Sequence, residues 1–148
     1  MITWVIPIFT ICLLLGFIKL PSIQFFILFS IALFGAVTIS YLIELIVGIL
    51  TFYTTSSWGL QCFKQAIMSF FSGALIPLEL MPVWLQNIAD IMPFKSIIYF
   101  PISIFLENLS IHEIVNGFIF QCIWIVILAI LSGILYKRAI RKVTIAGG

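Results

Sequence analysis

Residues 72–94 read SGALIPLELMPVWLQNIADIMPF, and this segment decides the fold because it interrupts long apolar stretches with Pro77, Pro82 and Pro93. Proline lacks a backbone donor and ends or kinks a helix. The segment also carries a glutamine, an asparagine and an aspartate, whereas the stretches on both sides are apolar enough to cross a bilayer. It therefore marks a break between hydrophobic helices.

The whole chain has the composition of a membrane protein. Its 148 residues are 64% hydrophobic and 8% charged, with a mean hydropathy of +1.32, whereas a soluble domain is about half apolar and about a quarter charged. The net charge of +2 is too small and too localised to indicate nucleic-acid binding. The cysteines lie far apart, without the spacing of a metal site, so we expect neither a metal nor a cofactor.

Four segments are predicted to cross the membrane, because a helix needs about 20 apolar residues to cross the hydrocarbon core. They are residues 2–18, 23–52, 58–76 and 114–136. The first is short enough for a signal peptide, but it lacks a basic start and a cleavage site, so we expect a retained helix. Backbone groups in hydrocarbon must be paired within the segment. We therefore predict one all-α domain over residues 1–148, a polytopic helical membrane protein.

The basic C-terminal end sets the predicted orientation. Residues 137–142 read KRAIRK and follow the last span directly, which places the tail, residues 137–148, in the cytoplasm by the positive-inside rule. Counting back through four crossings places the N-terminus there too. We therefore predict a multi-pass protein of the cell inner (plasma) membrane with both termini cytoplasmic, and with residues 77–113 on the outer side.

The proline-rich segment continues into a second short apolar piece on that outer side. Pro82 suits a first helical turn, and apolar and polar residues of 83–92 fall on opposite faces of a helix. Pro93 ends this helix, and residues 94–107 are again too short to cross. We predict a helical hairpin over residues 82–107, amphipathic and re-entrant, between the third and fourth spans. An ordinary interfacial loop is the alternative.

One carboxylate, Glu44, lies clearly inside a predicted span. A charged side chain at membrane depth costs about 3 kcal/mol or more unless it is paired or protonated. Lys64, near the cytoplasmic start of the third span, can reach it if the second and third spans pack together. We predict an intramembrane polar pair, Glu44 with Lys64, whose role is either structural or part of a substrate or gating pathway.

The features around the break occur in a particular order. A helix ends in Ser72-Gly73, and then follow Pro77, Pro82-Val83-Trp84-Leu85, Pro93-Phe94 and a last helix with a basic tail. This order resembles the C-terminal part of ABC-2 type permeases, the membrane subunits of bacterial ABC exporters. In that family the pattern begins a re-entrant hairpin on the outer side, and the resemblance implies that the hairpin is the outer gate. The candidate gate residues are Pro77, Pro82, Trp84, Leu85, Ile88, Pro93 and Phe94.

The resemblance also implies partners. Such permeases work with a cytoplasmic ATP-binding cassette ATPase and with a second permease subunit, as a homodimer or heterodimer. The chain itself has no GxxxxGK[ST] loop and no catalytic cluster at membrane depth, so we expect no enzyme activity. Family members usually have six helices, and this chain starts in the equivalent of the third. The resemblance therefore implies a truncated or split permease, whose missing helices another polypeptide supplies.

The polar groups of the spans are sparse, and they bear on the substrate. Thr38, Ser40, Tyr41 and Ser69 are the hydroxyl groups available from the second and third spans, which favours an amphipathic drug, lipid or peptide over a sugar or an ion. A proton-coupled secondary transporter is one alternative, although it would place more ionisable groups in the spans and often shows internal repeats. A small non-catalytic membrane anchor or assembly protein is another.

Overall fold

The computed structural model describes residues 21–51, 54, 57–73, 76 and 80–146. The predicted first span, residues 2–18, and Pro77 lie outside these ranges. Every regular element within them is a helix, so the predicted all-α class is confirmed.

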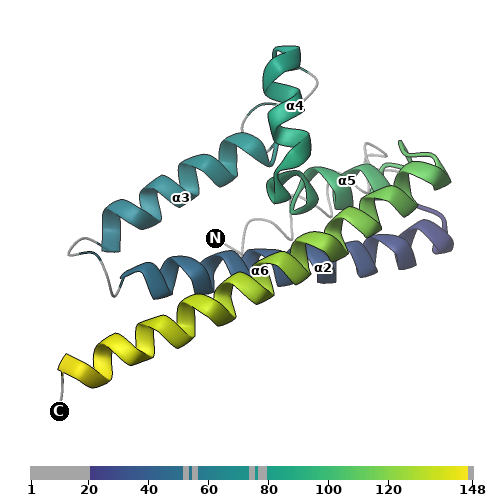
Figure 1. The fold of residues 1–148 in the computed structure, drawn as a ribbon. Coiled ribbons are helices and arrows are strands. Elements are labelled where there is room, and N and C mark those ends of the chain that lie inside the picture. The colour runs from purple at the N-terminus through teal and green to yellow at the C-terminus, as the bar shows by residue number, and fades with distance from the viewer. Residues whose placement is uncertain (1–20, 52–53, 55–56, 74–75, 77–79, 147–148) are drawn as a thin grey trace, which may run out of the picture.

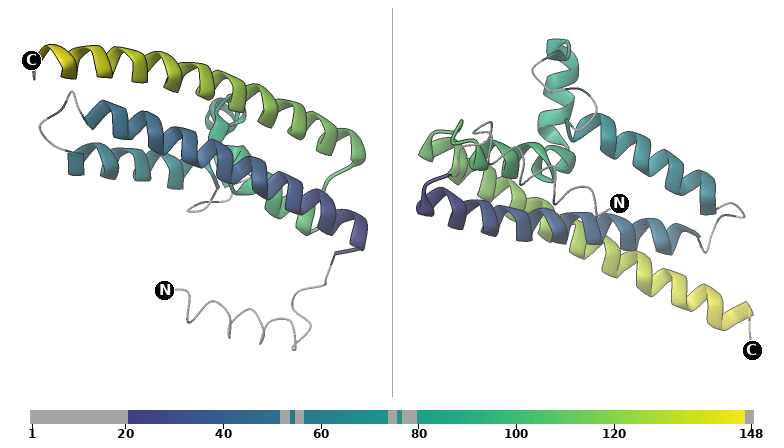
Figure 2. Two further views of the ribbon diagram at one scale, coloured as in Figure 1. Left: turned by 90° about the horizontal axis from the view of Figure 1, so that it is seen from below. Right: turned by 180° about the vertical axis from the view of Figure 1, so that it is seen from behind.

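Two long helices form the body of the structure: α2 (Ile23–Thr51) and α6 (Ile111–Ala146). They measure about 43 Å and about 54 Å at 1.5 Å per residue, and within the described ranges they are the helices long and apolar enough to cross a membrane. They lie side by side and run in the same direction (Figures 1 and 2). If both cross, the chain between them must therefore return once through the membrane.

Helix α3 (Ser57–Phe71) runs back along α2 from the end where α2 finishes (Figure 1). It stops at Phe71, earlier than the predicted span end at residue 76. Gly73 has φ 80°, a left-handed conformation that favours glycine and commonly ends helices. With 15 residues, α3 is about 22 Å long and too short to cross a bilayer alone. The number of crossings stays a prediction.

Three short elements connect α3 to α6: α4 (Val83–Ile91), the 3₁₀-helix η2 (Pro93–Ser96) and α5 (Tyr99–Phe105). The chain bends by 72° between α4 and the segment Pro93–Phe105, so the helix break lies at Pro93 as the sequence predicts. Helix α4 stands off the long helices, while α5 lies against them (Figures 1 and 2).

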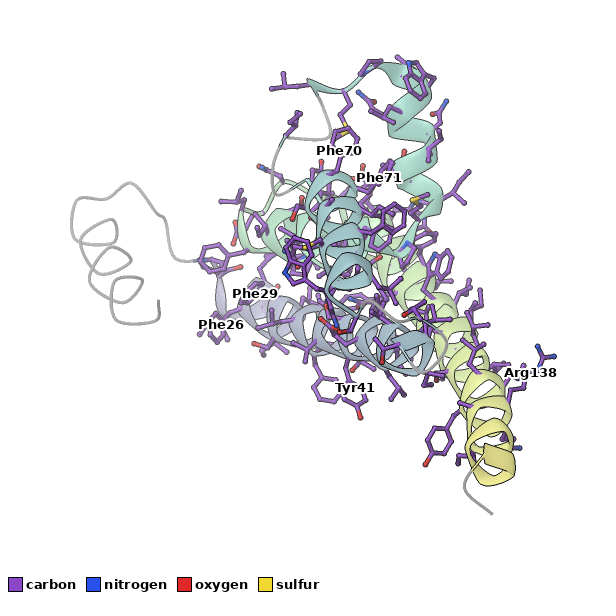
Figure 3. The ribbon with its side chains drawn as sticks, turned by 90° about the vertical axis from the view of Figure 1, so that its left-hand side faces the viewer. Phe26, Phe29, Tyr41, Phe70, Phe71 and Arg138 are labelled. Atoms are coloured by element: carbon purple, nitrogen blue, oxygen red, sulfur yellow. The ribbon has the colours of Figure 1, made fainter. Side chains whose placement is uncertain are left out.

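The tightest packing is where α5 meets α2 and α6. Phe100 and Ile104 of α5 form a buried cluster with Ala32 of α2 and Ile114 of α6. A Cβ atom on Gly117 would lie 2.1 Å from the Phe100 ring, so the glycine is what lets this ring contact the α6 backbone. A smaller cluster joins α3 to α4, with Phe70 and Phe71 at the junction (Figure 3).

Candidate functional site

The turn of the hairpin, η2, is seated between α3 and α6. The Phe94 ring lies 6.4 Å from the Phe71 ring of α3, centroid to centroid, in a stacked arrangement. Pro93 and Ser96 are buried. The hairpin turn is thus held by ring packing on one side and by polar contacts on the other.

Gln121 of α6 makes those polar contacts. Gln121 is only 3% exposed. Its side-chain amide nitrogen donates to the carbonyl oxygens of Ala32 at 3.0 Å and Ser96 at 3.3 Å. A buried amide is stable only when its hydrogen bonds are made. One side chain therefore ties α2, α6 and the hairpin turn together, at about 15 Å along α6 from its first residue.

Gly35 of α2 makes room for this amide. A Cβ atom there would lie 2.5 Å from the Gln121 side chain, closer than any side chain tolerates. The sequence interpretation missed this arrangement. The signal that was available is a glutamine inside the apolar stretch of α6, because polar residues in membrane helices usually face other helices.

A second polar tie joins the far end of the hairpin to the start of α2. Glu107 has φ 56°, which is uncommon for a non-glycine residue. The amide of Asn108 donates to the Ser103 carbonyl at 3.1 Å and closes the end of α5. The Glu107 carboxylate accepts a 2.7 Å hydrogen bond from the backbone amide of Ser22, just before α2. The amides at the start of a helix have no partner within the helix, so this bond stabilises the beginning of α2.

Helix α6 begins with a capping box. Ser110 Oγ and its amide donate to Glu113 Oε2 at 2.7 and 2.8 Å, and the Glu113 amide donates back to Ser110 Oγ at 3.4 Å. The S-x-x-E pattern was present in the sequence as a start signal, and it explains why α6 begins at Ile111 rather than at residue 114. Glu107 and Glu113 thus fix both helix starts next to the hairpin.

The apolar residues of α4 divide between two faces. Leu85 and Ala89 pack toward Phe70, Phe71 and Tyr99, whereas Trp84, Ile88 and Ile91 are exposed on the chain by itself, at 65%, 39% and 71%. The last three follow the spacing i, i+4, i+7 and form a second apolar stripe, the outer stripe of α4. Pro82 precedes the first turn of α4. Three other candidate gate residues are held in the structure, because Leu85 packs in the α3–α4 cluster, Pro93 is buried and Phe94 stacks on Phe71.

Glu44 and Lys64 meet where α2 and α3 run side by side. Lys64 Nζ and Glu44 Oε1 form an ion pair. The Lys64 side chain is 10% exposed and that of Glu44 52% exposed, so the carboxylate lies at the edge of the α2–α3 contact. Whether this pair takes part in transport stays a prediction.

Charge reversal tests what this pair contributes. Glu44→Lys places two ammonium groups together and is expected to destabilise the protein by about 2–3 kcal/mol, whereas Glu44→Gln keeps a hydrogen-bond acceptor and should cost less. Adding Lys64→Glu to Glu44→Lys restores opposite charges and should recover most of the loss, measured as the thermal unfolding midpoint in detergent. A double variant no more stable than Glu44→Lys would mean that the pair contributes nothing.

Comparisons with known proteins bear on the family of the chain. A family model described as ABC-2 family transporter protein matches residues 1–147. Neither the curated proteins nor the solved structures give a match. In the residues that the structure describes, there is no group of three or more histidine, cysteine, aspartate or glutamate side chains that could hold a metal ion.

Proposed function

The chain belongs to the ABC-2 family of transporter proteins, and from this premise we propose that it is the permease subunit of an exporter that moves an amphipathic drug, lipid or peptide out of the cell. Members of the family are membrane transport components of ABC transporters, and ATP hydrolysis belongs to a separate subunit. The observation that carries the proposal is the buried attachment of the hairpin turn to both long helices through Gln121. Energy from the ATPase would reach the hairpin along these helices.

The two sides of the hairpin turn differ in the kind of contact they make. Hydrogen bonds from a buried amide are directional and costly to break, so η2 moves together with α2 and α6. The ring contact of Phe94 with Phe71 is less directional and allows sliding against α3. Closure of the ATPase would then shift the hairpin relative to α3. We propose that this shift, against a second permease subunit opposite, opens and closes the outer side of the transport pathway.

The orientation follows from direction and charge. Helices α2 and α6 run in the same direction, and α6 ends in the basic residues 137–142, which favours the cytoplasm for that end. The starts of both helices, with the hairpin beside them, then lie on the outer side. Residues 77–113, which include the hairpin, contain a single lysine and no arginine, and this scarcity of cations supports an outer position.

The available hydroxyl groups favour an amphipathic substrate. Thr38 Oγ1 donates to the Phe34 carbonyl and Ser40 Oγ to the Ala36 carbonyl, both at 2.9 Å, so these donors are taken up by their own helix. Tyr41 is 65% exposed and projects away from the helices (Figure 3). A surface of this kind offers apolar contact with few hydrogen-bond donors, which suits a lipid-like molecule better than a sugar.

The proposed function is tested in inside-out membrane vesicles. The chain, tagged after Gly148 and co-purified with an ATP-binding cassette ATPase of its source organism, should take up a fluorescent phospholipid analogue or rhodamine 6G when ATP is added, and should not do so with a hydrolysis-deficient ATPase. In a cysteine-free background, a cysteine at Gly148 should be labelled in these vesicles by a thiol reagent that does not cross the membrane. A cysteine at Asn87 should be labelled by this reagent only in right-side-out vesicles. Absence of ATP-driven uptake, or labelling of both sites from one side, would contradict the proposal.

A further inference from the structure

A cavity of about 400 Å³ lies between the hairpin and the first three turns of α6. This volume is within the range of small-molecule sites, about 300–1,000 Å³. From α6 it is lined by Glu113, Asn116, Gly117 and Phe120, which follow the helical spacing i, i+3, i+4, i+7 and so share one face. From the hairpin it is lined by residues of α4, η2 and α5. The proposed function assigns no role to this space.

The charges that line the cavity do not balance. Asp90 and Glu113 supply two carboxylates, and Lys95 is the one basic side chain among the lining residues. Lys95 Nζ pairs with Asp90 Oδ1 at 2.5 Å. Glu113 Oε2 accepts hydrogen bonds from the backbone amide and the hydroxyl group of Ser110. Both donors are uncharged, so they do not neutralise the carboxylate. The cavity therefore carries a net negative charge beside Glu113.

Aromatic rings supply the rest of the recognition surface. Tyr99, Phe100 and Phe120 line the cavity, and Lys95 Nζ lies over the Tyr99 ring at 5.2 Å from its centroid. Ammonium groups are attracted to ring faces at this distance. The chain thus already places one cation, the Lys95 ammonium group, between a carboxylate (Asp90) and an aromatic ring (Tyr99).

We propose that this cavity binds an amphiphile through an ammonium headgroup, with Glu113 compensating the positive charge and the aromatic rings contacting the headgroup and the adjoining apolar chain. The position supports this class of ligand, since Glu113 is in the first turn of a helix long enough to cross a membrane, where lipid headgroups and chains meet. The inference goes beyond the proposed export function, because binding requires neither the ATPase nor movement of the hairpin. The ammonium amphiphile has two possible sources, an aminophospholipid of the membrane or a soluble cationic amphiphile.

The test is native mass spectrometry of the full chain released from dodecyl maltoside, with two probes that carry an ammonium group, one a zwitterionic lipid and one a cationic amphiphile, and with an anionic lipid that lacks this group. Dioleoyl phosphatidylethanolamine and dodecyltrimethylammonium are the probes, and dioleoyl phosphatidylglycerol is the control lipid. We expect at least one of the two ammonium probes to bind about tenfold more tightly than phosphatidylglycerol. Binding of the lipid alone assigns the site to an aminophospholipid, and binding of dodecyltrimethylammonium alone assigns it to a soluble amphiphile.

Two variants decide whether binding occurs in this cavity. Glu113→Gln removes the charge but keeps an acceptor for the capping box, and Tyr99→Leu removes a ring. Each variant should weaken binding of the ammonium probe about tenfold. Glu107→Gln is the matched control, because it removes the same charge at the same end of the protein but outside the cavity, and it should bind as the unmodified chain does. Equal binding of all three lipid and amphiphile probes, or unchanged binding in both variants at unchanged thermal stability, would overturn the proposal.

Discussion

Replacing Gly117 with alanine is expected to lower the free energy of unfolding by about 2–3 kcal/mol, since overpacking a filled core costs about 1–3 kcal/mol. The added Cβ atom would lie 2.1 Å from one Phe100 ring carbon and 2.5 Å from another. Phe100 is 7% exposed and packs in a buried cluster with Ala32, Ile104 and Ile114, so the ring can move away from the added atom only by giving up these contacts. We expect α5 to detach from α6, which a lower thermal midpoint in detergent would report.

Gly133 provides the control on the same helix. A Cβ atom there meets nothing within 4 Å, while Gly133→Ala brings the same gain in helix propensity as Gly117→Ala. The difference between the two variants therefore measures the contact with Phe100. Phe100→Leu, combined with Gly117→Ala, should recover part of the lost stability. Equal midpoints for the two alanine variants would show that α5 does not pack on α6 in this way.

Hydrophobic length and proline placement account for the parts of the fold that the sequence could predict. Helix α2 runs over Ile23–Thr51, within one residue of the predicted 23–52, because an uninterrupted apolar stretch of this kind has no other way to pair its backbone in a membrane. Pro93 removes a helical hydrogen bond, and the 72° bend follows directly at that position.

Helix ends were less predictable, because they depend on single residues. The predicted tail, residues 137–148, continues α6 as helix to Ala146, since its alanine, lysine and arginine residues favour helix and no glycine or proline lies between Tyr136 and Ala146. At the other end, the capping box starts the helix earlier than hydropathy alone indicates. Hydropathy predicts which residues can contact lipid. The two ends of α6, in contrast, are set by backbone hydrogen bonds.

The site residues that hold the hairpin could not be identified from the sequence. Gln121, Gly35 and Gly117 matter because of what lies opposite them, and periodicity along one helix does not say which residue of another helix it meets. The same limit applies to α4. Its apolar residues were predicted to share one face, but Leu85 and Ala89 pack into the cluster with α3, whereas Trp84 and Ile91 of the outer stripe are mostly exposed. Amphipathicity separates apolar from polar faces, and it does not separate protein contact from lipid contact.

Ile88→Asp is expected to abolish transport in the complex with the ATPase, because it places a charge in the outer stripe of α4. Trp84, Ile88 and Ile91 are exposed on the isolated chain, and in the proposed exporter they would meet lipid or a second permease subunit. A carboxylate at membrane depth costs about 2.5–3.5 kcal/mol, enough to move a nine-residue helix held mainly by Leu85 and Ala89. The attachment of η2 by Gln121 is untouched, so the complex should still assemble.

Asn87→Asp is the matched control for this prediction. It introduces the same carboxylate one position earlier on the same helix, at an exposed residue that is already polar, where it costs less because it does not replace an apolar contact. The two variants should therefore assemble equally with the ATPase, as measured by co-purification, and differ in ATP-driven uptake of rhodamine 6G, with Asn87→Asp close to the unmodified chain. Uptake at the unmodified rate by Ile88→Asp would mean that α4 does not move during transport. The hairpin would then be a fixed support for α2 and α6, and the outer gate would have to be sought on α3.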